Sequence, residues 1–242
     1  MTLLHTTARI LRQLRHDKRT IALLVVVPTL LLTLLYFMYD NQEMIFDRVA
    51  LIMLGLFPFI IMFLVTSIAM LRERTTGTLE RLLTTPLRRT DLLFGYGIAF
   101  GVAAAIQATI ASALAYWLLD LDTAGSPALV ILIAVTNAVL GVALGLLASA
   151  FAQTEFQAVQ FMPVVALPQI LLCGLFVPRD QMAGWLQAIS DVMPLTYAVE
   201  ALQQVGAHPE ATATMWRDLG IVAGVVVLAL VLASLTLRRR TP

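Results

Sequence analysis

Hydrophobic residues along this chain gather in six long runs that contain no Asp, Glu, Lys, Arg or His. A helix needs about 20 mostly apolar residues to cross a bilayer, and each run meets or nearly meets that length. Backbone polar groups in lipid must pair within the protein, so such runs form helices, and they lack the alternation of β-barrel strands. We predict an all-α polytopic membrane protein with one transmembrane domain over 1–242 and spans at 20–39, 49–71, 92–119, 127–150, 157–177 and 219–237.

Charged residues make up 13% of the 242 residues, against about 25% in a soluble domain, and they cluster between the apolar runs. If six helices alternate across the membrane with both termini on one side, thirteen of the sixteen lysines and arginines fall on that side. Cytoplasmic loops carry the excess of positive charge. The sequence therefore predicts a multi-pass protein with both termini in the cytoplasm.

Two stretches outside the spans have a helical pattern of their own. Residues 1–19 place Leu3, Ile10 and Leu14 near one helical face and basic residues on the rest, which is typical of an interfacial helix. Either anionic lipid headgroups or a cytoplasmic partner would explain the basic face. Residues 178–206 hold two short apolar segments separated by a break at Pro194. We predict an outer re-entrant hairpin that acts as an exit gate, with a loop resting on the membrane surface as the alternative.

Glycines four residues apart, at 97 and 101 and again at 141 and 145, allow two helices to approach closely. Packing within one subunit and pairing of two subunits both remain open as the use of these positions. Pro163 and Pro168 fall in the fifth span. Each removes a hydrogen bond from the helix, so we expect this span to bend or break.

The segment 72–91 between the second and third spans is rich in arginine. Gly77 can end one helix or cap the next, and Glu80 suits the first turn that follows. Pro86 stops that helix. We predict a short cytoplasmic coupling helix that transmits a push into the membrane. A positively charged loop that only sets the topology is the alternative, because the arginine content supports both.

Two motifs carry a resemblance to a known family. The first reads Gly77-Thr78-Leu79-Glu80-Arg81-Leu82-Leu83-Thr84-Thr85-Pro86, and the second combines Cys173-Gly174-Leu175-Phe176-Val177-Pro178 with Pro194-Leu195-Thr196-Tyr197-Ala198-Val199-Glu200-Ala201-Leu202. In this order, with six spans, they resemble the ABC-2 type transporter permeases, and the daunorubicin-type multidrug branch in particular.

The resemblance implies a subunit of an exporter in a bacterial inner membrane. It implies pairing with a second permease, as a homodimer or heterodimer, and docking of a separate ATP-binding cassette subunit that binds ATP and Mg²⁺. The coupling residues would be Gly77, Thr78, Leu79, Glu80, Arg81, Leu82, Leu83, Thr84 and Pro86. The residues of the outer gate would be Phe176, Pro178, Trp185, Pro194, Tyr197 and Glu200.

Several classes of chemistry are missing from the sequence. No Gly-Lys-Ser/Thr motif occurs, so we expect no ATP-binding site, no other cofactor and no enzymatic activity in this chain. One cysteine and three scattered histidines make no metal site and no intramembrane catalytic group. A proton-coupled transporter usually keeps ionisable residues within its spans, and these runs have none. We expect membrane lipid and protein partners, and no nucleic acid.

The apolar and amide side chains within the spans suggest what moves through the protein. They favour a hydrophobic or amphipathic cargo, drug-like or lipid-like. The resemblance implies that this cargo is exported from the cytoplasm, in multidrug efflux or antibiotic resistance. The candidate path residues are Met53, Phe57, Phe63, Asn137, Gln160, Phe161 and Gln169. Interhelical hydrogen bonding is the alternative role of the amides. An ion- or proton-coupled secondary transporter and a membrane scaffold without transport are the alternative functions.

Overall fold

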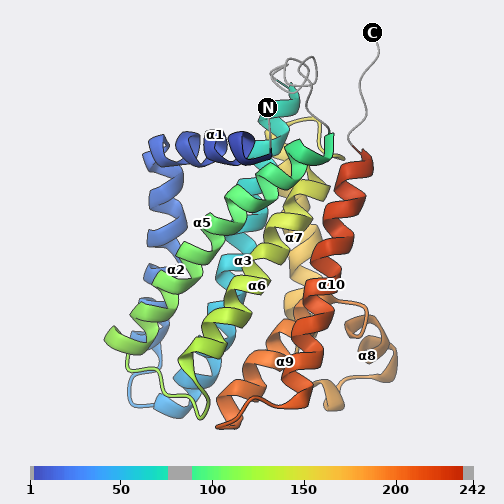
Figure 1. The fold of residues 1–242 in the computed structure, drawn as a ribbon. Helices are drawn as coiled ribbons and strands as arrows, with labels where there is room; N and C mark the ends of the chain where they lie inside the picture. Colours follow the sequence, from blue (N-terminus) through green and yellow to red (C-terminus); the bar gives the residue numbers. More distant parts are fainter. Residues whose placement is uncertain (1–2, 76–88, 237–242) are drawn as a thin grey trace.

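The computed structural model describes residues 3–75 and 89–236, and all its regular elements in these ranges are helices. Figure 1 shows them as an elongated bundle. The helices are α1 (Leu3–His16), α2 (Lys18–Met38), α3 (Glu43–Thr75), α5 (Arg89–Leu118), α6 (Pro127–Ala148), α7 (Glu155–Leu172), the 3₁₀ turn η1 (Arg179–Gln181), α8 (Gly184–Ser190), α9 (Pro194–Ala207) and α10 (Ala213–Thr236).

Six of these helices are long and apolar enough to cross a membrane, which confirms the predicted fold class among the described residues. They are α2, α3, α5, α6, α7 and α10, and they run along the bundle (Figure 1). The helix α1 lies across one end, and α8 and α9 lie toward the other. We call these ends the α1 end and the α9 end.

The centre of the bundle is the contact between α3 and α6. A Cβ atom added to Gly141 would lie 2.3 Å from the backbone oxygen of Phe59, and one added to Gly145 would lie 2.5 Å from that of Phe63. Only glycine lets the two backbones come this close. The pair at 141 and 145 therefore serves packing within one chain, whereas Gly97 and Gly101 make only ordinary side-chain contacts with α10 and α6.

The six long helices differ in how far they are buried inside the chain. In the apolar stretches of α3 and α6, 67% and 61% of the residues are buried, against 17% in α2, 17% in α7 and 22% in α10. Apolar side chains on the last three therefore face outward, where lipid or another subunit would cover them. Exposed aromatic side chains lie near both ends of the bundle, as is typical of membrane interfaces: Phe151, Phe156, Trp117 and Trp216.

The helix α1 packs on α5 through its less polar face. Thr6, Thr7 and Ile10 are buried, and the Thr7 hydroxyl donates a weak hydrogen bond of 3.5 Å to the backbone oxygen of Gly95. Of the basic residues predicted for the rest of this helix, Arg12 and Arg15 are exposed, whereas Arg9 turns toward Tyr96 of α5. Whether lipid or a partner protein covers the exposed basic residues stays a prediction.

Three helices differ in extent from the predicted spans. The helix α3 continues beyond 49–71 at both ends, and α10 begins six residues before 219 because the Thr212 hydroxyl accepts a hydrogen bond from the Met215 amide and caps it. The helix α7 ends at Leu172 rather than 177, since Gly174 adopts a left-handed φ of 90°, a common helix end. Pro163 and Pro168 lie within α7, which continues through both without a break.

Candidate functional site

The predicted coupling residues 77–86 lie outside the residues that the structure describes, but the helix that leads into them is described. The last turn of α3 carries three consecutive charges, Arg72, Glu73 and Arg74. Arg72 forms an ion pair with Glu155 at the start of α7, and Glu73 lies 3.6 Å from Arg9 of α1. Arg9 also donates a hydrogen bond of 3.3 Å to the hydroxyl of Tyr96 on α5. The end of α3 is thus joined directly to α7 and α1, and through Arg9 to α5.

Beside the start of α7 lies a cavity of about 650 Å³ near the α1 end. Two of the predicted path residues, Gln160 and Phe161, line it. The other lining residues were not predicted for the path, and they are Phe151, Gln153, Gln157, Pro163 and Val164. Aromatic faces beside amide groups suit an amphipathic molecule better than an ion.

The remaining path candidates lie inside the chain, away from this cavity. Met53 and Phe63 are buried, and Phe57 is half-buried. Asn137 is fully buried and donates a hydrogen bond of 2.8 Å to the backbone oxygen of Gly55, so it links α6 to α3. Gln169 joins α7 to α9, since its side-chain oxygen accepts a hydrogen bond of 3.3 Å from the Leu195 amide. In this conformation both amides hold helices together.

The predicted gate residues surround η1, α8 and the start of α9. Phe176 and Trp185 are 66% and 67% exposed, and Pro178 is exposed as well. Pro194 is the first residue of α9, which packs against α3, α6 and α10 and buries seven of its residues. The predicted hairpin is therefore a helical insertion with one side embedded in the bundle. How deeply it enters the membrane stays a prediction.

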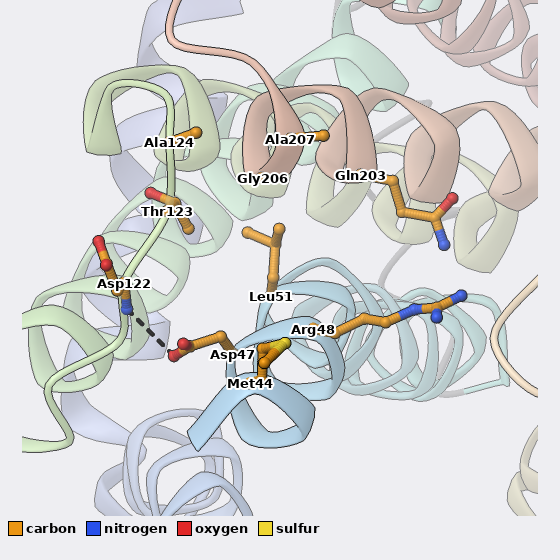
Figure 2. A pocket seen from close by; sticks show the side chains of 10 residues that line it. All are labelled: Met44, Asp47, Arg48, Leu51, Asp122, Thr123, Ala124, Gln203, Gly206 and Ala207. Atoms are coloured by element: carbon orange, nitrogen blue, oxygen red, sulfur yellow. Dashed lines mark hydrogen bonds between the residues drawn. The ribbon is translucent and has the colours of Figure 1, made fainter. Parts of the chain in front are cut away.

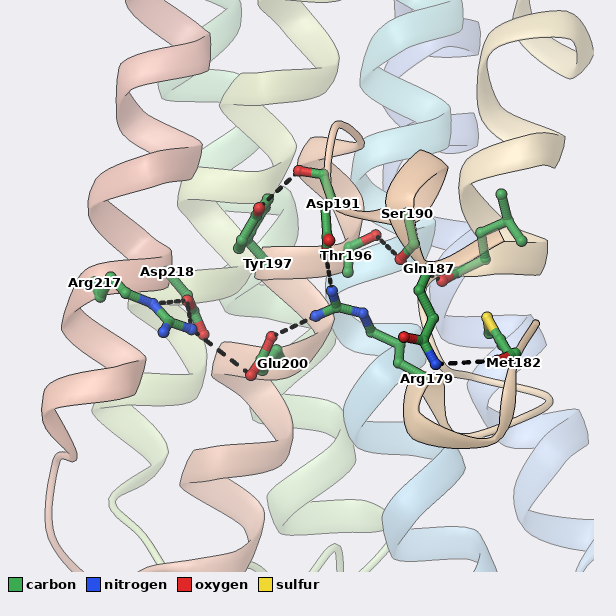
Figure 3. Close-up of polar contacts among 11 residues, drawn as sticks. Arg179, Met182, Gln187, Ser190, Asp191, Thr196, Tyr197, Glu200, Arg217 and Asp218 are labelled. Atoms are coloured by element: carbon green, nitrogen blue, oxygen red, sulfur yellow. Dashed lines mark hydrogen bonds and ion pairs between the residues drawn. The ribbon is translucent and has the colours of Figure 1, made fainter. Parts of the chain in front are cut away.

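A cluster of five charged residues ties the gate region to α10 (Figure 3). Arg179 forms ion pairs with Asp191 and, at 2.9 Å, with Glu200 of α9. Arg217 of α10 lies 3.7 Å from Glu200 and 2.7 Å from Asp218. The structure thus places the predicted gate residue Glu200 at the centre of this cluster.

The same region contains a hydroxyl contact and a buried carboxylate. The Tyr197 hydroxyl donates a hydrogen bond of 2.7 Å to the backbone oxygen of Asp191. Asp218 has no exposed surface, and its Oδ2 lacks a hydrogen-bond partner among the described residues. The sequence analysis took Arg179, Asp191, Arg217 and Asp218 to be ordinary loop charges and predicted no cluster. Arg179 directly follows one apolar run, and Arg217 and Asp218 directly precede another, so their positions in the sequence could have indicated a role.

A second cavity, of about 500 Å³, opens at the α9 end between α3, the α5–α6 loop and α9 (Figure 2). The Asp47 carboxylate lies at its edge and accepts a hydrogen bond of 3.1 Å from the backbone amide of Asp122. Gly206 and Gln203 of α9 complete one wall. This cavity therefore adjoins the inserted helix that was predicted to act as a gate.

None of these places holds a recognisable catalytic arrangement. Within residues 3–75 and 89–236, no group of three or more His, Cys, Asp or Glu side chains is arranged to hold a metal ion. The single cysteine, Cys173, is buried. The geometry offers cavities at both ends of the bundle and charged links between helices.

Comparison with known proteins gives the chain its relatives. The family described as "ABC-2 type transporter" matches residues 2–205. The probable multidrug ABC transporter permease YbhR of Escherichia coli (strain K12) is 32% identical over 156 residues, which cover 64% of this chain and 42% of that protein. The linearmycin resistance permease protein LnrN of Bacillus subtilis is 28% identical over 138 residues, which cover 57% of this chain and 36% of that protein.

A eukaryotic protein shows the same likeness. ABC transporter G family member 20 of Dictyostelium discoideum is 26% identical over 181 residues, which cover 73% of this chain and 24% of that protein. The chain spans less than half the length of each of these relatives.

Proposed function

This chain belongs to the ABC-2 type transporter family, and from that premise we propose that it is the membrane-spanning permease subunit of an ATP-driven exporter. It moves hydrophobic or amphipathic molecules out of the cytoplasm, and a separate ATP-binding subunit hydrolyses the ATP. The family match over residues 2–205 carries this proposal. The absence of a Gly-Lys-Ser/Thr motif from the sequence agrees with a partner that supplies the ATP site.

The α1 end is the cytoplasmic end in this proposal. Exposed basic residues gather there, with Arg12, Arg15, Lys18 and Arg19 in or near the α1–α2 corner, and basic residues favour the cytoplasmic side. The helix α3 ends at the same end of the bundle, and the chain continues from its last turn into residues 77–86. Movement of the ATP-binding subunit against that segment would reach α1, α5 and α7 through the contacts of Arg72, Glu73 and Arg9.

A second permease copy, identical or related, would cover the outward face of α7. Val164, Leu167 and Leu171 are exposed along that helix, whereas α3 is mostly buried within its own chain. The cavity lined by Gln160 and Phe161 adjoins this face and would admit cargo from the cytoplasmic side. The names of two relatives refer to multidrug transport and to linearmycin resistance, which supports a drug-like or lipid-like cargo.

The α9 end would release the cargo. The cluster of Arg179, Asp191, Glu200, Arg217 and Asp218 holds the inserted helices against α10. Rearrangement of these pairs would open the outer side beside the exposed Phe176 and Trp185.

The test begins with the tagged chain purified from its native membrane together with the subunits bound to it. We expect an ATP-binding cassette protein in the complex and ATPase turnover that an amphipathic dye or drug stimulates. Glu80→Ala and Leu82→Asp should each lower the stimulated turnover severalfold, because the resemblance assigns both residues to the contact with the ATPase. Undiminished stimulation in both variants, or transport by the chain without a nucleotide-hydrolysing partner, would contradict the proposal.

A further inference from the structure

The ion pair between Arg72 and Glu155 connects the last turn of α3 to the first turn of α7. The Arg72 Nε donates to Glu155 Oε1 at 2.7 Å, and Nη2 donates to Oε2 at 3.0 Å. A two-point contact of this kind fixes the orientation of both side chains as well as their distance. It therefore constrains where α7 begins relative to α3.

The apolar contact beside this pair is small and separate from the main core. Leu71 of α3 packs with Ala152 and Ala158, and Ile68 and Phe161 lie against them. The two larger hydrophobic clusters contain none of these five residues. Among the described residues, the start of α7 is thus attached to the bundle by this ion pair, by the minor cluster and, next to Pro163, by Met162, which packs against the largest cluster.

Pro163 separates this part of α7 from the rest of the helix. Proline has no backbone N–H, so the carbonyl of Val159 loses its usual partner one turn earlier, and helices bend at such positions. Beyond Pro163 the helix is held differently: Ala166 packs in the largest hydrophobic cluster, and Gln169 and Leu172 are bonded to α9 and α8. Residues 155–162 can therefore move about the contact that Met162 makes beside Pro163, while the remainder stays in place.

We propose that Arg72 and Glu155 form a latch that holds residues 155–162 against α3, and that its release swings this half of α7 outward and widens the cavity of about 650 Å³ lined by Gln160 and Phe161. Both are positioning residues. The functional meaning of the latch rests on the proposed function, because α3 leads into the segment assigned to the ATP-binding subunit.

The latch affects local opening far more than overall stability. The side chains of Arg72 and Glu155 are 59% and 53% exposed, and ion pairs at such exposed positions contribute little to folding. Charge-reversal variants should therefore fold. The population in which residues 155–162 have moved away from α3 should still increase, since few other contacts oppose that movement.

A buried thiol placed under the latch measures this opening. In a Cys173→Ala background, Ala158→Cys puts a thiol at a position with no exposed surface in the small cluster. Its reaction with a water-soluble maleimide in open membrane fragments should follow the open population. We expect Arg72→Glu and Glu155→Arg each to raise the labelling rate about twofold to fivefold, and the double charge swap to restore it.

Two controls separate the latch from general loosening. Ala166→Cys puts the thiol on the same helix beyond Pro163, where 1% of the side chain is exposed, and its labelling rate should not respond to the charge reversals. Arg12→Glu changes the charge at the same end of the bundle at an exposed position, and it should leave labelling at 158 unchanged. The thermal unfolding temperature of each variant is measured alongside.

Unchanged labelling at 158 in both single reversals, or no restoration in the double swap, would overturn the latch. Equal acceleration at 158 and 166 would also overturn it, since the whole helix or the whole chain would then be opening. These measurements need no ATP-binding subunit. Failure of the proposed function would instead appear in the stimulated ATPase turnover of Glu80→Ala and Leu82→Asp, with the latch result intact.

Discussion

The consecutive helices α6 and α7 are both long and apolar enough to cross a membrane, but they have opposite places in the molecule. In α6, 61% of the apolar stretch is buried, and two glycines bring its backbone against α3. In α7 the share is 17%, two prolines interrupt its hydrogen bonding, and one exposed ion pair holds its start. The first helix has no room to move, whereas few residues of the second are buried.

This difference indicates a division of labour within the chain. The α3–α6 pair is a rigid centre, because close backbone contact leaves no alternative packing of similar energy. The helix α7 can change its contacts at small cost, since its outward face depends on whatever covers it. A transporter needs both a frame that keeps its shape and a segment that alternates between arrangements.

The largest effect should come from closing the space between α3 and α6. Gly141→Val would place a side chain 2.3 Å from the Phe59 oxygen, and overpacking of a tight helix contact costs several kcal/mol, about 3 or more. We expect little folded protein in the membrane, measured as the monodisperse fraction after solubilisation.

Gly224→Ala of α10 is the matched control, since an added Cβ there meets nothing within 4 Å. It should leave that fraction unchanged. Normal yield of Gly141→Val would show that the α3–α6 contact is looser than these distances require.

A smaller effect should follow from breaking the charge cluster that holds the region beyond α7. Arg179→Gln removes the partner of Asp191 and the nearer of the two partners of Glu200. Hydrogen bonds to charged groups contribute about 1.5–3 kcal/mol, so we expect a loss of about 2 kcal/mol in the free energy of unfolding. Limited proteolysis between α7 and α9 should accelerate, while cleavage in the α5–α6 loop should not. Equal acceleration at both places would argue against a local role.

The buried amide of α6 should matter more than the exposed amide of α7. Asn137→Leu removes the hydrogen bond to the Gly55 oxygen and should cost about 1 kcal/mol. Gln160→Leu changes an exposed side chain that lines the cavity and should leave unfolding within about 0.5 kcal/mol. Denaturant titration measures the free energy of unfolding of both variants. A larger loss for Gln160→Leu than for Asn137→Leu would contradict this prediction.

The smallest effect concerns α2, which is as exposed as α7 and, like α7, begins with a side-chain cap. Hydrogen bonds from the Thr20 hydroxyl and amide lower the pKa of Asp17. Because this pKa is lowered, the charged cap stabilises the folded state at every pH above the ordinary pKa of an Asp carboxyl. The stabilisation is lost as the pH falls through the pKa that Asp17 has in the folded protein.

Asp17→Ala should cost about 0.5–1 kcal/mol at neutral pH and less in acid. Thermal unfolding at neutral pH and at a pH below 3.8, the ordinary pKa of an Asp carboxyl, measures the difference. A cost that does not shrink in acid would show that the charge of Asp17 plays no part in the cap.

Much of the fold could be predicted because hydrocarbon imposes simple requirements. Charge-free runs of sufficient length located all six long helices, although the charges that end an apolar run do not end the helix: Asp47 and Arg72 belong to α3, and Arg217 belongs to α10. The early end of α7 could have been inferred from Gly174, which follows its cap. The pairs of Arg72 with Glu155 and of Arg179 with Glu200 were beyond reach, since 83 and 21 residues separate the partners.

By itself, the sequence determined that this is a helical membrane protein of the ABC-2 type with six helices long and apolar enough to cross a membrane. Only the tertiary structure decided which helices are central, which face outward and which charges meet. The reason is that lipid tails are as apolar as a protein interior, so hydropathy is the same on both sides of a helix. The side of a helix that faces the protein differs from the side that faces lipid in two ways: it packs closely at residues such as Gly141, and it provides partners for polar groups such as Asn137. Both features appear only when the helices are assembled.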